Sequence, residues 1–293
     1  MQTQKPLTLV DPQNGNLAFK IFSYNDDSHF DHVQRNNYYT VIINLSGGGK
    51  LKSDFSTYDF SGQVLMCFSP YQPFMINADD DLSGVILNFH PDFFCIHLHQ
   101  KEVACNGVLF NNIYQPPFIT LAEKDIASFL NIIEQMQIEM QNAALAQYEL
   151  LISYLKIFLI NGSRLRVEQS PMASAEISGL KEPFVLQSLK NALEENFKTK
   201  HSPAEYADLL NISPKALAKI TKNHFNKTLT NMIAERIVIE AKRELYLTSK
   251  PVKSIAYELG FNDEFYFSRF FKNNADVSPQ LYRETVGFAK AEA

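Results

Sequence analysis

The chain has 293 residues, of which 45% are hydrophobic and 20% charged, and its formal net charge is −5. This length predicts about two domains, because single cores commonly span ~100–200 residues. The apolar content excludes a wholly disordered chain, and 11 glycines and 13 prolines exclude a collagen-like or low-complexity one. Three cysteines (Cys67, Cys95 and Cys105) are too few for a disulfide framework and fit a reducing compartment.

No targeting or membrane signal is found along the chain. The N-terminal residues contain no basic segment followed by a long apolar one, so no secretory signal is predicted. The most apolar stretch, Tyr148–Ile160, is shorter than the ~20 residues that cross a bilayer, and it contains Glu149 and Lys156. We therefore expect a cytoplasmic protein with no membrane partner.

The first 110 residues have the pattern of β-structure. Tyr38–Leu45 is rich in aromatic and β-branched residues, and the glycines Gly47–Gly49 follow it. Gln63–Ser69 and Gly84–Phe89 are further apolar runs, and clusters of Gly, Pro, Asn and Asp separate the runs. Short strands bounded in this way predict a sandwich or a barrel.

Residues 121–160 predict two helices, Glu123–Gln141 and Leu145–Ile160. In the second helix, apolar residues recur at spacings of three and four, which favours a seam between two copies of the chain. The residues of this candidate dimer interface are Leu145, Tyr148, Ile152, Leu155 and Leu159. The alternative is that the stripe belongs to the domain's own core. Residues 161–181 are polar and lack a strong period, so we interpret them as a linker.

From residue 182 onward the pattern is helical, and the charge changes sign near this boundary. Residues 1–180 carry 10 Lys and Arg and 18 Asp and Glu, which gives −8. Residues 181–293 carry 17 and 14, which gives +3, and the two sums recover −5. The net acidity of the chain therefore does not exclude a nucleic-acid partner for the helical part, although +3 alone is weak support for one.

The helical part contains an internal repeat. Tyr206–Asn211 and Ile255–Gly260 each place an alanine four residues before Asn or Gly, and Leu210 matches Leu259. Asn and Gly most readily adopt the left-handed conformation that a sharp turn between helices needs. Each copy therefore predicts a helix that ends in such a turn.

A second helix is predicted after each turn. The first runs over Lys215–Phe225 behind Ser213 and Pro214, and the second begins near Asn262 and ends at Lys272. A connecting helix, Leu229–Leu247, has an apolar stripe and would fix the spacing of the copies. Two helix-turn-helix units on one rigid connector predict entry into successive major grooves of DNA, roughly 34 Å apart. The alternative is a plain helical bundle with a chance repeat.

The second copy resembles the AraC family of bacterial transcription regulators. Residues 255–261 fit the motif I-A-x-x-x-G-F, residues 266–272 fit Y-F-x-R-x-F-K, and residues 278–283 fit S/T-P-x-x-Y-R. The resemblance covers about residues 184–286. The first copy departs from the family pattern L-x-R-x-F-K, because it reads Leu217-Ala-Lys219-Ile-Thr221-Lys222. A lysine cannot reproduce the planar fork that arginine offers to guanine, so phosphate contact would dominate there.

The resemblance implies a set of DNA-facing residues. They are Lys215, Ala218, Lys219, Lys222, Glu264, Phe265, Ser268, Arg269 and Lys272. Arg269 suits a guanine edge, Ala218 and Phe265 suit a thymine methyl, and Glu264 suits a cytosine amino group. Lys222 and Lys272 suit phosphates. For Asp263 we favour stabilisation of the helix N-terminus by its negative charge over contact with a base.

In this family a cupin-like β-barrel that senses a small molecule commonly precedes the DNA-binding part. The pattern from His29 and His32 through Pro70 resembles such a domain loosely. The effector-binding candidates are Phe19, His32, Tyr39, Phe68 and Phe89, although each aromatic could simply fill the core. A cupin metalloenzyme would need a glutamate soon after the first histidines and a histidine in residues 70–77, and neither is present.

We therefore expect an α+β protein of two domains. Residues 1–160 would form a cupin-like β-barrel with two helices that senses an effector and dimerises, residues 161–181 a linker, and residues 182–293 an all-α DNA-binding domain with two helix-turn-helix motifs. The expected function is sequence-specific transcription regulation with no catalytic residues, cofactor or metal. The expected partners are double-stranded promoter DNA and a second copy of the chain, while a small-molecule effector and RNA polymerase are further candidates. The alternatives are a cupin-type metalloenzyme fused to a DNA-binding domain and a regulator controlled by protein partners without a ligand.

Overall fold

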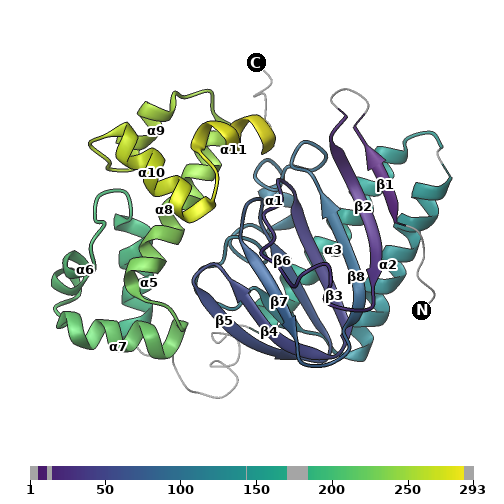
Figure 1. Cartoon of the computed structure of the whole chain (residues 1–293), viewed down its shortest axis with the longest axis horizontal. Helices are drawn as coiled ribbons and strands as arrows, with labels where there is room; N and C mark the ends of the chain where they lie inside the picture. Colours follow the sequence, from purple (N-terminus) through teal and green to yellow (C-terminus); the bar gives the residue numbers. More distant parts are fainter. Residues whose placement is uncertain (1–5, 12–14, 143, 170–183, 287–293) are drawn as a thin grey trace. The chain divides into compact units, whose positions relative to one another are not determined.

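The computed structural model describes residues 6–11, 15–142, 144–169 and 184–286. The chain forms two compact units, one of residues 1–112 and 116–167 and the other of residues 113–115 and 168–293. We call them the N-terminal domain and the helical domain. The strands lie in the first and the long helical series lies in the second (Figure 1), so the predicted mixture of a β-rich N-terminal part and an all-helical C-terminal part is confirmed.

The strands of the N-terminal domain form two antiparallel sheets. They are β1 (Leu7–Val10), β2 (Leu17–Tyr24), β3 (Tyr39–Ser46), β4 (Gly48–Ser53), β5 (Ser56–Ser61), β6 (Val64–Phe68), β7 (Phe74–Ala78), β8 (Ser83–Phe89) and β9 (Phe118–Thr120). The order is β1-β2-β8-β3-β6-β9 in one sheet and β5-β4-β7 in the other. The two sheets do not join by strand pairing among the described residues. The predicted closed barrel is therefore wrong, and the architecture is two sheets packed face to face.

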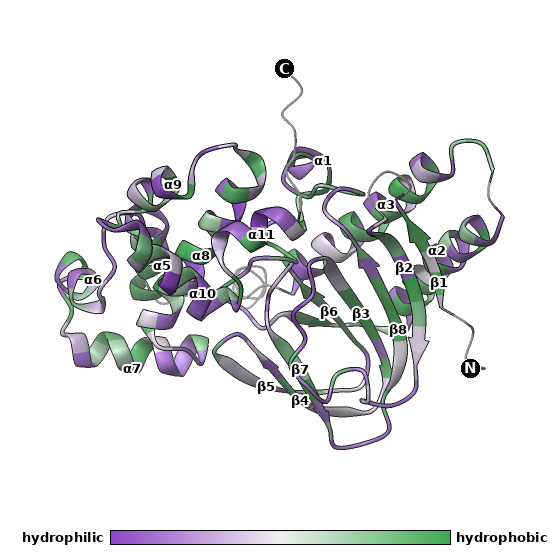
Figure 2. Cartoon of the chain, turned by 45° about the horizontal axis from the view of Figure 1, so that its top comes forward, coloured by the Kyte–Doolittle hydropathy of each residue, from purple (hydrophilic) through white to green (hydrophobic). Residues whose placement is uncertain are grey.

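The six-stranded sheet is buried on both faces. Side chains alternate along each strand, so neighbouring residues contact different cores. In β3, Val41 and Ile43 belong to the core on the helix side, whereas Ile42 lies in the core shared with Leu51 of β4 and Phe74 of β7. Double burial explains the continuous apolar runs of the sequence, which Figure 2 shows as hydrophobic strands.

Two long helices cover the outer face of the six-stranded sheet. They are α2 (Glu123–Gln141) and α3 (Gln147–Glu168), and a short helix, α1 (Gln100–Val103), precedes them. The rings of Phe129 in α2 and Phe158 in α3 lie 4.6 Å apart between the helices. In the part of the chain that the structure describes, no helix is both long and apolar enough to cross a membrane.

Helix α3 continues through the first part of the predicted linker, so that prediction is wrong for residues 161–168. Gly162 and Ser163 are buried, and a β-carbon on Gly162 would lie 3.1 Å from the Leu109 side chain. Arg166 is also buried, and its guanidinium donates to the backbone oxygens of Phe118, at 2.6 Å, and Pro116. The polar sequence did not predict this packing, because small and charged residues make the contacts. Residues 170–181 of the predicted linker lie outside the described residues.

The helical domain contains the repeat found in the sequence. Its helices are α5 (Phe184–Asn196), α6 (Pro203–Leu210), α7 (Pro214–Phe225), α8 (Leu229–Leu247), α9 (Val252–Glu258), α10 (Glu264–Ala275) and α11 (Pro279–Val286). The pairs α6–α7 and α9–α10 are the two helix-turn-helix units, and α8 is the predicted connector with the predicted bounds (Figure 1).

Both predicted turn residues adopt the left-handed conformation. Asn211 has a φ of 53° and Gly260 a φ of +81°. Gly260 is also under a steric constraint, because a β-carbon there would lie 2.1 Å from the backbone oxygen of Lys198. The two turns therefore share a conformation, but only the second one excludes every side chain.

We expect Gly260→Ala to destabilise the helical domain much more than Asn211→Ala. Both variants place an alanine at positive φ, which costs about 1–2 kcal/mol, but only Gly260→Ala adds a clash with backbone. Hydrogen-exchange protection of the α9 and α10 amides in the full chain measures the difference. Equal losses of protection would contradict the steric argument.

Candidate nucleic-acid interface

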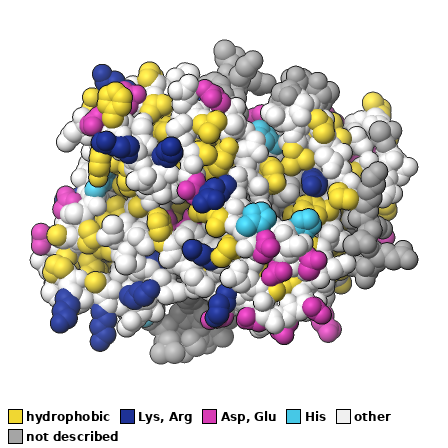
Figure 3. Space-filling model, in the orientation of Figure 1, with side chains coloured by type: hydrophobic (Ala, Val, Ile, Leu, Met, Phe, Trp, Pro, Cys, Tyr) yellow, Lys and Arg dark blue, Asp and Glu magenta, His cyan; other side chains and the backbone are white. Residues whose placement is uncertain are grey.

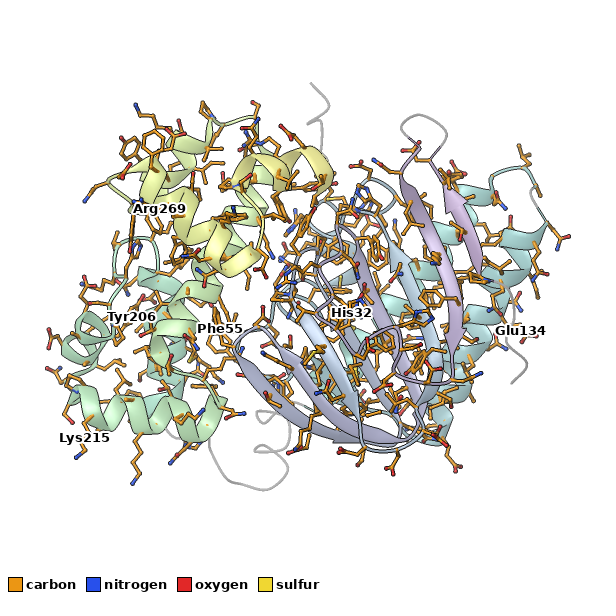
Figure 4. All side chains as sticks on the ribbon, viewed as in Figure 1. His32, Phe55, Glu134, Tyr206, Lys215 and Arg269 are labelled. Atoms are coloured by element: carbon orange, nitrogen blue, oxygen red, sulfur yellow. The ribbon has the colours of Figure 1, made fainter. Side chains whose placement is uncertain are left out.

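Helix α7 presents the predicted DNA-facing residues of the first unit to solvent. Its start is fixed by Ser213, whose hydroxyl accepts a hydrogen bond from the Ala216 amide at 3.3 Å, and by Pro214 in the first turn. Leu217, Thr221 and Phe225 are buried at spacings of four, which turns the opposite side outward. The exposed residues are Lys215, Ala218, Lys219 and Lys222. Figure 3 shows Lys and Arg side chains over α7, and Figure 4 labels Lys215 at its start.

Helix α10 presents the second set. The Asp263 carboxylate accepts a hydrogen bond from the Phe265 amide at 2.9 Å, so Asp263 is the N-cap of α10. Phe267 and Phe271 are buried, whereas Phe265 is 76% exposed. The remaining predicted residues are Arg269 and Lys272, which are exposed, and Glu264 and Ser268, which are partly exposed. Arg269 is labelled on α10 in Figure 4.

Sequence reasoning missed two exposed tyrosines beside this surface. Tyr266 in α10 is 58% exposed, and Tyr257 in α9 is 52% exposed. The helical period could have predicted the exposure of Tyr266, because Phe267 and Phe271 already occupy the buried side of α10 and leave position 266 outside it. An exposed Phe265–Tyr266 pair is costly to leave in water and is suited to stacking or apolar contact.

Helix α8 holds the two units in place. The residues of its predicted apolar stripe are all buried: Ile233, Ile237, Ala241 and Leu245. The helix contacts α7, α9, α10 and α11. At its C-terminal end, the Arg283 guanidinium of α11 donates to the backbone oxygens of Leu245, at 3.1 Å, and Lys250, at 2.7 Å. Arg283 therefore ties α11 to the end of α8.

A buried ion pair joins the end of the first recognition helix to α8. The Lys227 ammonium lies 2.7 Å from the Glu235 carboxylate, and the two side chains are 5% and 6% exposed. Buried pairs of this kind contribute little net stability but cost much when one partner is removed. The pair therefore ties the turn that follows α7 to α8.

A second charged cluster on α8 is centred on Arg236. The Arg236 guanidinium is 2.8 Å from Glu194 and 3.3 Å from Glu240, and it stacks 3.9 Å above the Phe197 ring. Burial raises the pKa of Glu240, but Arg236, Lys198 and Arg243 lower it more, so the pKa lies below its usual value. Arg236 is thus engaged within the domain and is not available as a DNA contact.

The effector-binding candidates do not line one pocket. Phe19, Tyr39 and Phe89 pack on the helix side of the six-stranded sheet, and the Tyr39 and Phe89 rings stack at 4.9 Å. Phe68 lies on the opposite face, stacked at 3.8 Å on Phe74. The His32 side chain is 69% exposed and pairs with Asp31 at 2.7 Å. The grouping is therefore wrong: three residues are core, one lies between the sheets and one is on the surface.

Metal ligation finds no support among the described residues, where no group of three His, Cys, Asp or Glu side chains could hold an ion. The three cysteines are free and buried. Burial raises the pKa of Cys105 to about 12, which disfavours the thiolate that a metal would need.

The predicted dimer seam is wrong at its centre. Leu155 and Leu159 are fully buried in the core of their own domain, and Tyr148 and Ile152 pack against that core. Leu145 is 99% exposed but precedes α3, which begins at Gln147. Residues on the inner stripe of a covering helix repeat at the same spacings as a coiled-coil seam, so the sequence period alone could not separate the two.

We expect Glu235→Ala to destabilise the helical domain by about 3–5 kcal/mol, because it leaves the buried ammonium of Lys227 without its carboxylate. A double variant, Lys227→Met with Glu235→Met, removes both charges and should lose far less. Hydrogen exchange of the α7 and α8 amides in the full chain reports both changes. A double variant as unstable as Glu235→Ala would contradict this account.

Comparisons with known proteins agree with this geometry. The family "Helix-turn-helix domain" matches residues 206–285. The raffinose operon transcriptional regulatory protein RafR of Pediococcus pentosaceus is 32% identical over 95 residues, which are 32% of this chain and 34% of that protein. The HTH-type transcriptional activator Btr of Bacillus subtilis (strain 168) is 24% identical over 248 residues, 82% of this chain and 43% of that protein.

The chain thus spans about a third to under half of the length of these relatives. Among solved structures, ToxT from Vibrio cholerae O395 covers 92% of this chain and 98% of its own, with 15% identity and a TM-score of 0.40. That score is too low to assign a shared fold to the whole chain. The family match, the named regulators and the doubled helix-turn-helix geometry agree on one conclusion: the helical domain of this chain is a DNA-binding domain of the AraC type.

Proposed function

We propose that the chain is a sequence-specific transcription regulator that binds promoter DNA through α7 and α10 and responds to a small molecule through its N-terminal domain. The observation that carries this proposal is the doubled unit. Two helices of similar length each begin at a capping residue, bury one apolar side, and expose the other side for contact. A rigid connector joins them, as binding in two successive grooves requires.

The two recognition surfaces have different chemistry. The exposed side of α7 carries three lysines around Ala218 and offers point charges to phosphate oxygens. The exposed side of α10 carries Arg269, which can form a bidentate pair with guanine, and Phe265, which can contact a thymine methyl. We therefore propose that α7 contributes mainly salt-dependent affinity and that α10 contributes mainly sequence discrimination.

Dimerisation is part of the proposal, with an interface moved to the outer side of α3. Leu150 and Ile157 are 40% and 48% exposed and lie seven residues apart, on one side of the helix. A second copy of the chain would cover them and double the number of recognition helices, which raises affinity through effective concentration. RNA polymerase remains a candidate partner, and a cytoplasmic location remains an expectation from the sequence.

The assignment of roles to α7 and α10 can be tested with the full chain. Lys219→Ala should weaken binding to all DNA sequences alike and reduce the slope of log affinity against log salt by about one. Arg269→Ala should cost about 1–3 kcal/mol and relax specificity at one base pair. Fluorescence anisotropy with a selected operator and its single-base variants measures both quantities.

Lys52→Ala, which changes an exposed lysine of the N-terminal domain, is the matched control and should alter neither quantity. A uniform loss for Arg269→Ala would reassign that residue to phosphate contact. An affinity of the parent chain that does not depend on salt would reject the proposed phosphate contacts, and no binding to any DNA would reject DNA binding itself.

Leu150→Asp combined with Ile157→Asp should convert the proposed dimer to monomers, because two carboxylates would be buried at the interface without partners. Phe55→Asp is the control, since Phe55 is also exposed, at 43%, but lies in the turn between β4 and β5. Sedimentation equilibrium gives the mass of each protein. An unchanged mass for the double variant would reject this interface.

A further inference from the structure

A direct contact joins the start of the first helix-turn-helix unit to the turn of the second. The loop of residues 197–202, which leads from α5 into α6, lies against the turn between α9 and α10. A β-carbon added to Gly260 in that turn would lie 2.1 Å from the backbone oxygen of Lys198 and 3.2 Å from His201 Nε2. The centres of the His201 and Phe261 rings are 4.9 Å apart. We call Lys198, His201, Gly260 and Phe261 the loop–turn contact.

The loop side of this contact is fixed to the first unit. The backbone amides of His201 and Ser202 donate to the Glu205 carboxylate at 3.1 and 3.0 Å, in the capping box at the start of α6. The Tyr206 hydroxyl donates to the backbone oxygen of Lys200 at 3.1 Å. A displacement of His201 would therefore disturb the first turn of α6.

The turn side of the contact is fixed to the second recognition helix. Phe261 is 4% exposed, and the centre of its ring lies 5.2 Å from that of Phe267 and 5.1 Å from that of Phe270, both in α10. The Tyr266 ring of the same helix lies 5.9 Å away. Because three aromatic side chains of α10 pack around this one ring, a displacement of Phe261 would also displace α10.

The internal repeat shows that the position of His201 has a different role in each copy. The copies begin at residues 206 and 255 and are therefore offset by 49 positions, which aligns His201 with Lys250. The Lys250 ammonium lies 3.0 Å from the carboxylate of Glu244 in α8 and 2.6 Å from that of Glu258 in α9. Lys250 thus ties the second unit to the connector, whereas His201 contacts the other unit.

Shape and not hydrogen bonding holds the His201 ring in this place. Its Nε2 atom is buried and has no hydrogen-bond partner among the described residues. A buried nitrogen without a partner costs free energy that an apolar side chain would avoid. The ring is therefore kept by its packing against Gly260 and Phe261, and it fills the space between the loop and the turn.

We propose that the loop–turn contact, together with α8, sets the distance and the rotation between α7 and α10, and that His201 is a positioning residue for DNA recognition. Both units pack on α8, and the contact gives them a second point of attachment that restrains their rotation about this helix. The chain then distinguishes operators by the number of base pairs between the bases that α7 and α10 contact. This inference rests on the proposed binding of DNA through these two helices and adds a spacing requirement to it.

Fluorescence anisotropy of the full chain measures the spacing requirement. The probes are a selected operator and two derivatives, with one base pair inserted or deleted between the two groups of bases that single-base variants define. Either change moves one group by about 3.4 Å and turns it by about 34–36° around the DNA axis. The parent chain should bind each derivative about tenfold more weakly or worse, because α10 then loses its pairing with base edges.

Two outcomes for the parent chain have different meanings. If it binds DNA but accepts all three operators alike, the spacing requirement is wrong and the proposed function stands. If it binds no operator, the proposed function itself is rejected.

Variants test whether the loop–turn contact is the cause. His201→Ala removes the ring from the loop side and should reduce the penalty for altered spacing by at least about threefold. Phe261→Leu removes the ring from the turn side and should act in the same direction. The double variant should add little to the larger single effect, since both changes break one contact. Lys250→Ala, at the matching position of the second copy, is the control and should leave the penalty unchanged.

The ratio of affinities separates positioning from general stability. A variant that only unfolds part of the protein binds all three operators more weakly by one common factor, so the ratio stays that of the parent chain. An unchanged ratio for His201→Ala would overturn the proposal, and so would an equal reduction for Lys250→Ala. Should His201→Ala bind no operator, the ratio for Phe261→Leu decides in the same way.

Discussion

The packing of α8 against four other helices is the constraint on which the helical domain depends. Its 19 residues span about 28 Å at the usual helical rise. Because both recognition helices pack against this one rod, their separation and orientation are set by its length and by the contacts at its ends. The Lys227–Glu235 pair acts at one end and Arg283 at the other. The exposed residues of α7 and α10 can then differ freely, because they do not take part in this packing.

The separation between packed and exposed residues also explains why net charge is a poor guide to what this chain binds. The net negative charge belongs to residues 1–180, and Figure 3 shows several acidic residues over the loops at one end of the sheets. In the helical domain, many of the charges neutralise one another around α8, as Arg236 does with Glu194 and Glu240. The lysines of α7 and the cations Arg269 and Lys272 of α10 are among those that point outward. Contact with DNA therefore depends on where charges lie and not on their sum.

The sequence predicted the helical domain well and the N-terminal domain less well, for a physical reason. Helix bounds follow from local signals, and Ser213, Asp263, Asn211 and Gly260 each act on their immediate neighbours. The arrangement of strands depends on contacts between distant residues. The six-stranded order and the open edges of the sheets could not be read from strand propensity, so a barrel was expected where two sheets exist.

The candidate site residues divide in the same way. The predicted residues on α7 and α10 are exposed or partly exposed, as their motif, which fixes a helical face, leads one to expect. The grouping of Phe19, His32 and Phe68 failed because it rested on residue type alone. Residue type does not show which face of a sheet a side chain occupies, or whether it lies on the surface. The extension of α3 to Glu168 was missed because Gly162, Ser163 and Arg166 are buried there without being apolar.

The two-sided burial of the six-stranded sheet has a consequence for how such a protein can change. Odd-numbered positions of β3, such as Val41 and Ile43, hold the covering helices, and even-numbered positions, such as Thr40 and Ile42, face the other sheet. A substitution at one parity leaves the contacts of the other intact. Selection can thus change the side chains between the two sheets while the helix-covered face keeps its own packing.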